Sequence, residues 1–537
     1  MVSKLNSRVN IHRKDIRDIF FSSLFFILSY APSPFGFLIY LAFVPQLYLY
    51  QRNKPLKSFV YGYLIGLIVN SCILYWLLFY AGAGFAIIVM LNALQFAILG
   101  WLLSLIFKHS KMGAIIIFPF LWTFLEYIRQ FGEIAFNWLN IAFTQTYFLY
   151  LIQFLDITGQ TGLVFWLCLI NTILYLIIFN RTHISALVKL GITLFLVFLL
   201  PLVYGFYRMD EEPAAEGLSI AYVQPNIDLD EKWDRKTQQK NLQILASMTD
   251  SIVITQPDLI IWPETAVPYN LREKEGDLDY IISHVEFNNY HLLTGAIDYS
   301  TIGTTRLKHN ATYLFTPGES MFHIYRKLLL VPGAETVPFK DIWPDRINPL
   351  GNEQLSAGQE PVIFKLKLLP YQMKFTEGDW QITGRARRVQ SINISSVICY
   401  ESVFPNIVQR FFDKGCDLLV IITNDTWFGY TSQPFQHLQA AVLRAIEQRS
   451  SVVRCANSGI SAFIDPYGRQ YLDSHLFHKS SAQKIMPIRK KLTFYSHHGD
   501  FVGIISGILV FSFLTFLTLN LKRKNSLNLS KSKNVFI

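Results

Sequence analysis

Long apolar runs recur along this chain, and they restrict its fold more than any other feature of the sequence. A helix needs about 20 apolar residues to cross the roughly 30 Å hydrocarbon core of a bilayer. The sequence therefore predicts a multi-span α-helical membrane bundle of eight helices. The first two runs are short and are separated only by residues 31–34, so they could instead form one re-entrant hairpin. The runs lie near residues 17–32, 35–50, 57–80, 84–107, 113–129, 161–179, 187–206 and 501–521.

Charged residues are distributed in a way that indicates membrane topology and not nucleic-acid binding. The net charge is +10, yet residues 208–498 hold 30 Lys and Arg against 32 Asp and Glu. The remainder holds 18 against 6, and its basic residues lie mostly in short segments between apolar runs. Positive charge of this kind marks cytoplasmic loops. We therefore expect both termini in the cytoplasm, residues 208–498 outside it, and no nucleic-acid partner.

These patterns divide the chain into three parts. Residues 1–207 are predicted to form an N-terminal membrane domain with about seven transmembrane helices. Residues 208–498 are predicted to form an extracytoplasmic domain. Residues 499–537 are predicted to form a last transmembrane helix with a basic cytoplasmic tail. The segment 131–160 is apolar but is broken by Gly, Asn and Gln, so we expect an outward arm on or in the membrane interface. A ninth span there would put the large domain in the cytoplasm, against the charge pattern.

The large polar part, residues 218–498, has the pattern of one α/β domain. Two helical stretches, 235–250 and 434–449, alternate with short apolar runs typical of buried strands. The segment 351–390 is polar and contains Gly and Arg, so we interpret it as an insertion or mobile loop. The strand-like runs are Leu218–Val223, Leu259–Trp262, Leu292–Ala296, Thr312–Phe315, Ile392–Cys399, Leu418–Thr423, Ser451–Cys455 and Ser461–Ile464.

Three reactive side chains follow predicted strands directly. Glu264 comes after the run Leu259–Trp262, Lys327 follows Tyr325-Arg326, and Cys399 ends the run Ile392–Cys399. The carboxyl ends of strands are where open α/β sheets place their sites. Taken alone, each has a more ordinary reading: a turn or helix-capping carboxylate, a surface lysine, and a small core residue. A turn follows Cys399 at once, and Glu401 lies beside the thiol; both argue against an ordinary core position for Cys399.

The five cysteines show no CxxC pair and no metal-ligand spacing. We therefore expect no disulfide framework, no metal and no cofactor. Cys399, Cys416 and Cys455 fall in the polar region, where a free thiol outside the cytosol needs an explanation; whether Cys416 and Cys455 do more than pack stays open.

Glu264, Lys327 and Cys399 follow successive strands in the order Glu, Lys, Cys. This arrangement resembles the catalytic set of the nitrilase, or carbon–nitrogen hydrolase, superfamily. Further motifs narrow the resemblance to its membrane member, the apolipoprotein N-acyltransferases. One motif departs: the family often reads Pro-Phe-Gly-Glu where this chain has Pro332-Gly333-Ala334-Glu335, although the Glu is kept. The motifs are Trp138-Leu139, Ile157-Thr158-Gly159, Val223-Gln224-Pro225-Asn226, Lys232-Trp233-Asp234, Trp262-Pro263-Glu264-Thr265, Cys399-Tyr400-Glu401, Asn424–Gly429, Arg444–Glu447, Arg454–Ser461 and Gly499-Asp500.

The resemblance implies a nitrilase-like α-β-β-α sandwich for residues 208–498 and a role for each matching residue. It makes Cys399 the nucleophile, Glu264 the general base, and Lys327 the cation that stabilises the oxyanion. The supporting residues are Glu335, which would position Lys327, the backbone N–H near Tyr400, and Glu401, expected at the mouth of the pocket. Trp233 matches an aromatic residue at the substrate entrance; alternatively, it is an interfacial anchor.

The resemblance also implies a reaction. Cys399 would take an acyl chain from a membrane phospholipid as a thioester and pass it to the N-terminal diacylglyceryl-cysteine of a lipoprotein. We expect a monomer in the bacterial inner membrane, with the catalytic domain on the periplasmic side. Two alternatives remain open: a membrane-tethered amidase that hydrolyses a small amide, and a scaffold or transporter with a decayed domain. The intact Glu264, Lys327 and Cys399 argue against decay.

Overall fold

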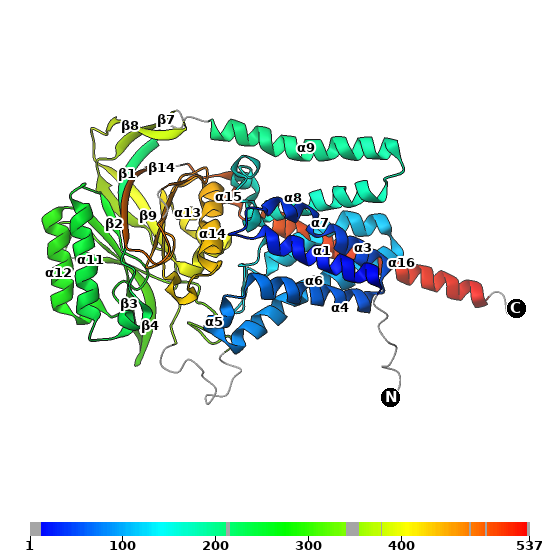
Figure 1. Ribbon diagram of the computed structural model, residues 1–537, viewed down its shortest axis with the longest axis horizontal. Helices are drawn as coiled ribbons and strands as arrows, with labels where there is room; N and C mark the ends of the chain where they lie inside the picture. Colours follow the sequence, from blue (N-terminus) through cyan, green and yellow to red (C-terminus); the bar gives the residue numbers. More distant parts are fainter. Residues whose placement is uncertain are drawn as a thin grey trace.

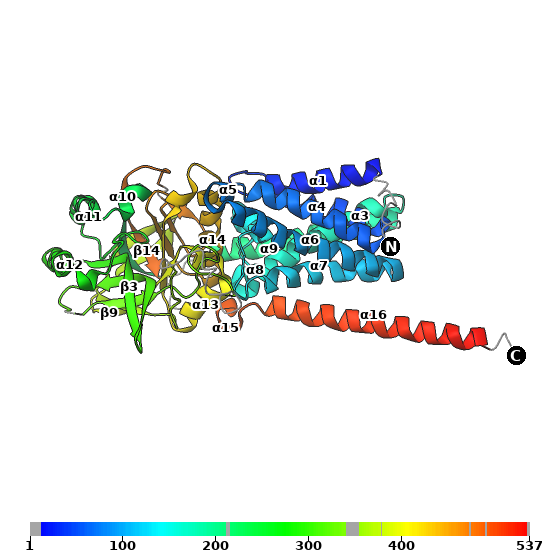
Figure 2. The same ribbon diagram turned by 90° about the horizontal axis from the view of Figure 1, so that it is seen from below.

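The computed structural model describes residues 12–210, 215–319, 321–339, 354–376, 378–471, 474–488 and 491–533. Helices gather at one end of an elongated molecule, and two sheets with their covering helices form the other end (Figures 1 and 2). The first turns of the first helix lie at the end of the helical part that is far from the sheets, and the last helix runs toward the same end and extends beyond it (Figure 2).

Within the described part of the chain, six helices are long and apolar enough to cross a membrane. The first predicted run forms a helix of only 17 residues, and the second is divided into η2 (Gly36–Leu38), α2 (Ile39–Ala42) and α3. Eight crossings therefore remain a prediction. The main helices are α1 (Arg13–Ser29), α3 (Val44–Arg52), α4 (Pro55–Ile73), α6 (Ala83–His109), α7 (Lys111–Ile128), α8 (Leu155–Phe179), α9 (Ile184–Met209) and α16 (Phe501–Lys533).

Small residues allow α4 and α6 to pack closely. A Cβ atom at Gly62 would come within 2.2 Å of the main-chain oxygen of Phe96, and one at Gly66 within 2.7 Å of the Cα of Ala93. Glycines four residues apart let helix backbones approach in an apolar environment, where van der Waals packing has to hold helices together. Any larger side chain at Gly62 would push the two helices apart.

The segment 131–160 lies between the bundle and the α/β domain. It contains turns and two short 3-10 helices, η3 (Ile141–Gln145) and η4 (Leu149–Leu151), and residues 155–160 already belong to α8. The predicted arm therefore ends earlier than expected. Trp138 is buried in it, and the side chain of Asn137 donates a hydrogen bond to the main-chain oxygen of Val403 in the α/β domain.

The α/β domain has two sheets packed face to face. The first has the order β5-β4-β3-β2-β1-β7-β8, with β14 paired to β1, and the second has the order β13-β12-β11-β10-β9-β6. The strands are β1 (Ala215–Gln224), β2 (Leu259–Ile261), β3 (His291–Ile302), β4 (Thr305–Phe315), β5 (His323–Arg326), β6 (Phe364–Leu368), β7 (Tyr371–Thr376), β8 (Asp379–Arg385), β9 (Gln390–Ile398), β10 (Leu418–Thr423), β11 (Val452–Ala456), β12 (Ala462–Ile464), β13 (Gln470–Tyr471) and β14 (Ser480–Ile488).

Helices cover the outer face of each sheet, so the predicted α-β-β-α sandwich is confirmed. Helices α11 (Gln238–Val253) and α12 (Glu275–Asn288) cover the first sheet, and α13 (Pro405–Asp413) and α14 (Gln433–Gln448) lie between the second sheet and the bundle (Figure 1). The inner faces meet in a largely apolar core. Polar contacts also cross it, among them one of 3.1 Å between the hydroxyls of Thr312 and Ser396.

The interpretation of 351–390 as a loop is wrong for the described residues from 364 to 385, which form β6, β7 and β8. Strand β6 alternates buried Phe364 and Leu366 with exposed Lys365 and Lys367. This two-residue period is typical of an edge strand with one face on the core. The polar composition of the segment obscured that alternation. Residues 351–353 and 377 lie outside the described residues.

Candidate active site

The three predicted catalytic side chains meet where three strands end. Glu264 lies three residues after β2, Lys327 directly after β5, and Cys399 directly after β9. The Nζ of Lys327 is 3.9 Å from Oε1 of Glu264, and the Cys399 thiol is close enough to feel the charges of both. Strands β2 and β5 belong to the first sheet and β9 to the second, so the site sits at one end of the seam between the sheets.

Glu264 is held by both its side chain and its main chain. Its carboxylate accepts a hydrogen bond of 2.7 Å from the side-chain amide of Asn310 on β4. The next residue, Thr265, has a φ of 45°, a left-handed conformation that costs energy for a side chain branched at Cβ. Gly295 on β3 lets this turn come close, because a Cβ there would lie 2.8 Å from the Cα of Glu264.

Lys327 is buried, with 1% of its surface exposed, and its partner is Glu335. Its Nζ donates to Oε1 of Glu335 at 2.9 Å and lies 2.8 Å from Oε2. Burial by itself would lower the pKa of Lys327, but the carboxylates of Glu335 and Glu264 outweigh it and raise that pKa. The two carboxylates therefore favour the charged form of the lysine. Asn310 also donates to Glu335, at 3.2 Å, so one amide bridges both carboxylates.

Cys399 begins the 3-10 helix η8 (Cys399–Val403) with a φ of 51°, so the strand turns sharply at the thiol. Burial and the nearby Glu264 raise the pKa of Cys399, while Lys327 and the Thr423 hydroxyl act against this shift. The resting group is a thiol and needs a base before it can attack. The N–H of Tyr400 lies in the first turn of η8, where helical N–H groups lack partners within the helix.

A buried polar chain supports the main chain of Cys399. Its carbonyl oxygen accepts a hydrogen bond of 2.8 Å from Ser402 and lies 3.2 Å from Nε2 of His437. Nδ1 of His437 is 3.1 Å from Asp425, which also pairs with Arg454 at 2.6 Å. His437 could not be placed near the nucleophile from the sequence, because it lies on a helix 38 residues further along the chain.

Glu401 does not lie at the mouth of a pocket as expected, because it is fully buried. Its Oε1 accepts hydrogen bonds from the main-chain N–H groups of Leu328 (2.6 Å) and Leu329 (3.1 Å), and its Oε2 accepts one from Ile398 (2.7 Å). The Tyr325 hydroxyl donates to Oε1 at 2.6 Å. Glu401 therefore ties the segment after Lys327 to the strand end before Cys399.

The structure does not bring Trp233 to the three catalytic residues. It is 42% exposed at the end of the short helix α10 (Leu229–Trp233). Its neighbour Lys232 makes the contact instead: the Nζ of Lys232 donates to the main-chain oxygen of Glu264 at 2.8 Å. The Lys-Trp-Asp motif marked this segment, but its sequence could not tell which side chain turns inward.

The bundle also contributes to the site. Tyr80, on the short helix α5 (Leu77–Ala81), lies within electrostatic range of Glu335, Cys399, Glu264 and Lys327. Its ring contacts Trp427 and Phe428, which follow β10, at centroid distances of 5.3 and 5.6 Å. Trp138 stacks on Tyr400 at 6.5 Å, and the Tyr400 hydroxyl donates to the main chain of Ala135. Aromatic residues from the bundle side therefore surround the catalytic end of the sandwich.

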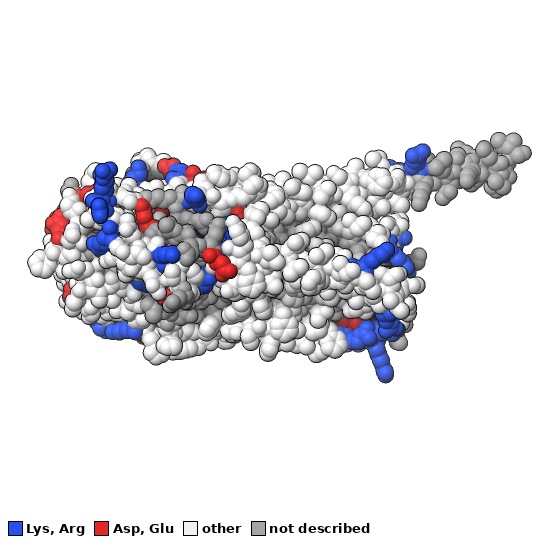
Figure 3. Space-filling view, turned by 90° about the horizontal axis from the view of Figure 1, so that it is seen from above, with Lys and Arg blue, Asp and Glu red and all other residues white. Residues whose placement is uncertain are grey.

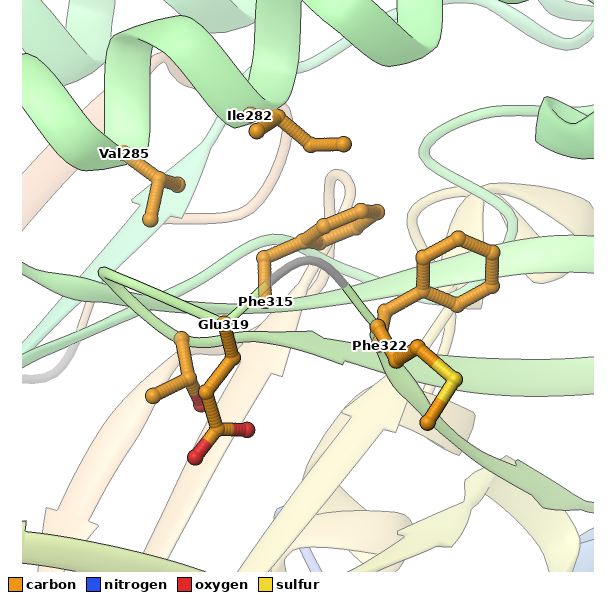
Figure 4. A pocket seen from close by; sticks show the side chains of 7 residues that line it. Ile282, Val285, Phe315, Glu319 and Phe322 are labelled. Carbon is orange, nitrogen blue, oxygen red and sulfur yellow. The ribbon is translucent and has the colours of Figure 1, made fainter.

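Two pockets differ in size and position. One of about 450 Å³ opens at the seam between the bundle and the α/β domain, where Tyr30, Cys72, Tyr75, Ser432 and Gln436 are among its lining residues. The other lies beside α12 and holds about 10 Å³; its lining, which includes Val285, Phe315 and Glu319, contains none of the predicted site residues (Figure 4). Among the described residues, no group of three or more His, Cys, Asp or Glu side chains could hold a metal ion.

Two protein families match the chain. The N-terminal domain of apolipoprotein N-acyltransferase matches residues 22–173, and the carbon–nitrogen hydrolase family matches residues 219–479. The first match covers most of the bundle, and the second covers both sheets of the sandwich apart from β14 and the start of β1.

Similar proteins carry the same description. The apolipoprotein N-acyltransferase of Chlorobaculum tepidum is 29% identical over 493 residues, covering 87% of this chain and 89% of that protein. The apolipoprotein N-acyltransferase of Rickettsia prowazekii is 30% identical over 415 residues, 76% of this chain and 77% of that protein. Among solved structures, Saccharomyces cerevisiae Nit3, a member of branch 10 of the nitrilase superfamily, is 15% identical with a TM-score of 0.37, covering 51% of this chain and 91% of that one.

Proposed function

The chain belongs to the apolipoprotein N-acyltransferase family, and on this premise we propose that it N-acylates bacterial lipoproteins by a ping-pong reaction through a thioester on Cys399. The acyl donor is a membrane phospholipid, and the acceptor is the amino group of an N-terminal diacylglyceryl-cysteine. The observation that carries the proposal is the cluster of a buried cation, Lys327, a carboxylate held beside it, Glu264, and a thiol within range of both charges.

In the first half-reaction, Glu264 takes the proton of the Cys399 thiol as the sulfur attacks the ester carbonyl of the phospholipid. The raised pKa of Cys399 is the reason that a base has to act at this moment. Lys327 and the N–H of Tyr400 stabilise the negative oxygen of the tetrahedral intermediate. The C–O bond then breaks, and Glu264 returns its proton to the departing oxygen, which releases lysophospholipid and leaves the acyl chain on sulfur.

In the second half-reaction, the neutral amino group of the acceptor attacks the thioester carbonyl. Glu264 accepts a proton from the attacking nitrogen and passes it to the sulfur as the C–S bond breaks. The products are an amide and the regenerated thiol, so no oxidant, reductant or cofactor is consumed. Glu335 keeps Lys327 in place during both steps, because it makes the shorter ion pair with that lysine.

Two lipid substrates explain why a nitrilase-like domain is joined to a membrane bundle. Between the charged α/β domain and the basic far end of the bundle, the face in Figure 3 carries few charged side chains. A band of this kind suits the hydrocarbon layer. We propose an orientation in the bacterial inner membrane with the catalytic domain on the periplasmic side. Cys399 would then lie near the headgroups of the outer leaflet.

Trapping the thioester tests this function. Enzyme mixed with phospholipid alone should gain one acyl chain on Cys399, which neutral hydroxylamine releases and a lipopeptide with a free amino-terminal diacylglyceryl-cysteine discharges. Cys399→Ala should abolish the label, whereas Cys416→Ala and Cys455→Ala should keep it. Rapid hydrolysis without transfer would favour the amidase alternative. A label that persists in Cys399→Ala would refute the proposed nucleophile.

A further inference from the structure

Lys232 is a buried lysine that the two half-reactions leave unused. Only 2% of its surface is exposed, and its Nζ donates a hydrogen bond of 2.8 Å to the main-chain oxygen of Glu264. Removing an ammonium group from water costs several kcal/mol even after relaxation of the protein. A surface position would avoid that cost, so the location of this lysine calls for a function beyond filling space.

The contact completes a three-sided support of the catalytic carboxylate. Asn310 holds the side chain of Glu264, and Gly295 allows β3 to press against its Cα. On the remaining side, the main-chain oxygen of Glu264 meets the Nζ of Lys232, which comes from a helix 32 residues earlier in the chain. The adjoining Thr265 has a left-handed φ of 45°. A turn in that conformation persists only where its surroundings hold it.

We propose that Lys232 is a positioning residue for Glu264, holding its main chain so that the carboxylate can reach the Cys399 thiol and the attacking amine. This inference rests on the proposed function, in which Glu264 is the base. It also assigns a task to helix α10. Trp233, at the end of that helix, is exposed at the surface, whereas Lys232 beside it is buried against the main chain of Glu264.

The charge of Lys232 adds a second effect on the base. Burial lowers the pKa of Lys232 to about 7, against the opposing attraction of Glu264. The charged pair nearest to it in the chain, Lys240 on α11 with Glu231 on α10, is exposed at the surface. The charge that Lys232 places beside Glu264 therefore changes near neutral pH, while its amine can donate the same hydrogen bond in either state.

Three variants separate positioning from a merely structural role. Lys232→Met keeps roughly the length of the side chain and removes both its hydrogen-bond donor and its charge. Lys232→Arg keeps a donor and a positive charge, but the guanidinium does not titrate near neutral pH. Lys240→Met, at an exposed lysine on the neighbouring helix, is the matched control. We expect Lys232→Met to lower kcat on the order of 10- to 100-fold with KM for phospholipid unchanged, as for a misplaced catalytic group. Lys232→Arg should recover part of kcat, and Lys240→Met should match the wild type.

A lipid-independent readout keeps this test apart from the proposed function. The rate at which iodoacetamide alkylates Cys399, followed by mass spectrometry of the peptide that contains it, reports removal of the thiol proton. In the wild type, the plot of this alkylation rate against pH should show a step near pH 7, and both Lys232 variants should lack the step. Thermal unfolding should show that Lys232→Met is no less stable than the wild type.

Two results would overturn the inference. In the first, Lys232→Met has the same alkylation rate and the same kcat as the wild type. In the second, Lys232→Met loses activity only in proportion to its loss of thermal stability, and its alkylation rate keeps the step near pH 7. Wild-type enzyme that shows the pH step, yet is never acylated by phospholipid, would refute the proposed function and leave the positioning role of Lys232 standing.

Discussion

Lys327 donates a hydrogen bond of 2.9 Å to Glu335, its closest charged partner. The distance from the same Nζ to Glu264 is 3.9 Å, so the two carboxylates share the lysine unequally. Glu335 also accepts the main-chain N–H of Val331 at 2.8 Å, which fixes it to the segment that carries Lys327. Glu335 therefore holds the Lys327 ammonium group in place, and Glu264 is free to exchange protons.

Glu335→Gln tests this division of labour. The substitution keeps the size of the side chain and removes the charge that raises the pKa of Lys327. We expect the rate of Cys399 acylation to fall about 10²-fold, the scale of a disturbed oxyanion contact. Glu319→Gln, at an exposed Glu in the turn before β5, is the control and should acylate normally. Equal rates in both variants would show that Glu335 does not position the lysine.

Substitution of the two residues that face the thiol should separate their roles. Glu264→Gln removes the base and should cost ~10²–10⁴ in rate. Lys327→Met removes the oxyanion charge and should cost ~10²–10³. Because Glu264 also raises the pKa of Cys399, Glu264→Gln should shift alkylation of that thiol to lower pH while acylation is lost. Near-wild-type turnover in either variant would mean that the catalytic residues are misassigned.

Much of the fold could be predicted because its signals are local. All eight strand-like runs fall on strands of the sandwich, and the stretches 235–250 and 434–449 overlap α11 and α14. Buried parallel strands read as continuous apolar runs. No predicted run covers β5, β6, β7, β8, β13 or β14. In β6, β7 and β8 many residues face solvent, which lowers the average hydrophobicity of these strands.

Glu264, Lys327 and Cys399 were assigned as catalytic residues by a family resemblance. They lie close together because the strands that precede them end at the same place in the sandwich. What could not be predicted is which polar residues turn inward. Lys232 and Glu401 look like surface residues in the sequence, yet both are buried against main-chain groups that only the folded sheets bring near. The contribution of Tyr80 depends on how the bundle docks, which no local pattern records.

Glu401→Gln should destabilise the α/β domain. Its two oxygens accept four hydrogen bonds, from Tyr325 and from the main chain of Leu328, Leu329 and Ile398. An amide group would turn a donor toward at least one of these donors, and an unsatisfied buried group costs about 1–3 kcal/mol. A lower Tm by circular dichroism, with reduced acylation, is the expected outcome. Glu360→Gln, at an exposed ion pair, is the control; an equal Tm in both variants would contradict the bracing role.

Stability should depend on pH through Asp500, where the α/β domain joins α16. Burial raises its pKa to about 6, and Arg444, the nearby cation, already makes two short contacts to Glu447. A raised carboxylate pKa stabilises the fold at low pH, and this contribution is lost as pH rises through 6. The cost above that pH is at most about 3 kcal/mol. Asp500→Asn should therefore gain Tm over the wild type between about pH 4 and pH 6 and keep that advantage at higher pH; a difference that is constant from pH 4 upward would contradict the shift.

The last prediction concerns topology, on which the access of both substrates depends. Arg52 and Lys57 pair with Asp15 in the first turn of α1, and that helix begins at the end of the bundle far from the sheets (Figure 2). If basic residues mark the cytoplasmic side, the α/β domain at the opposite end faces outward. A reporter joined near residue 300 should then be active only outside the cytoplasm, and reporters at residues 54 and 110 only inside it. Each fusion should retain acyl transfer where the full chain is present, which shows that the reporter has not reversed the protein. A cytoplasmic signal from residue 300 would separate Cys399 from the outer-leaflet lipid and from lipoproteins on that side, and the proposed reaction could not proceed as described.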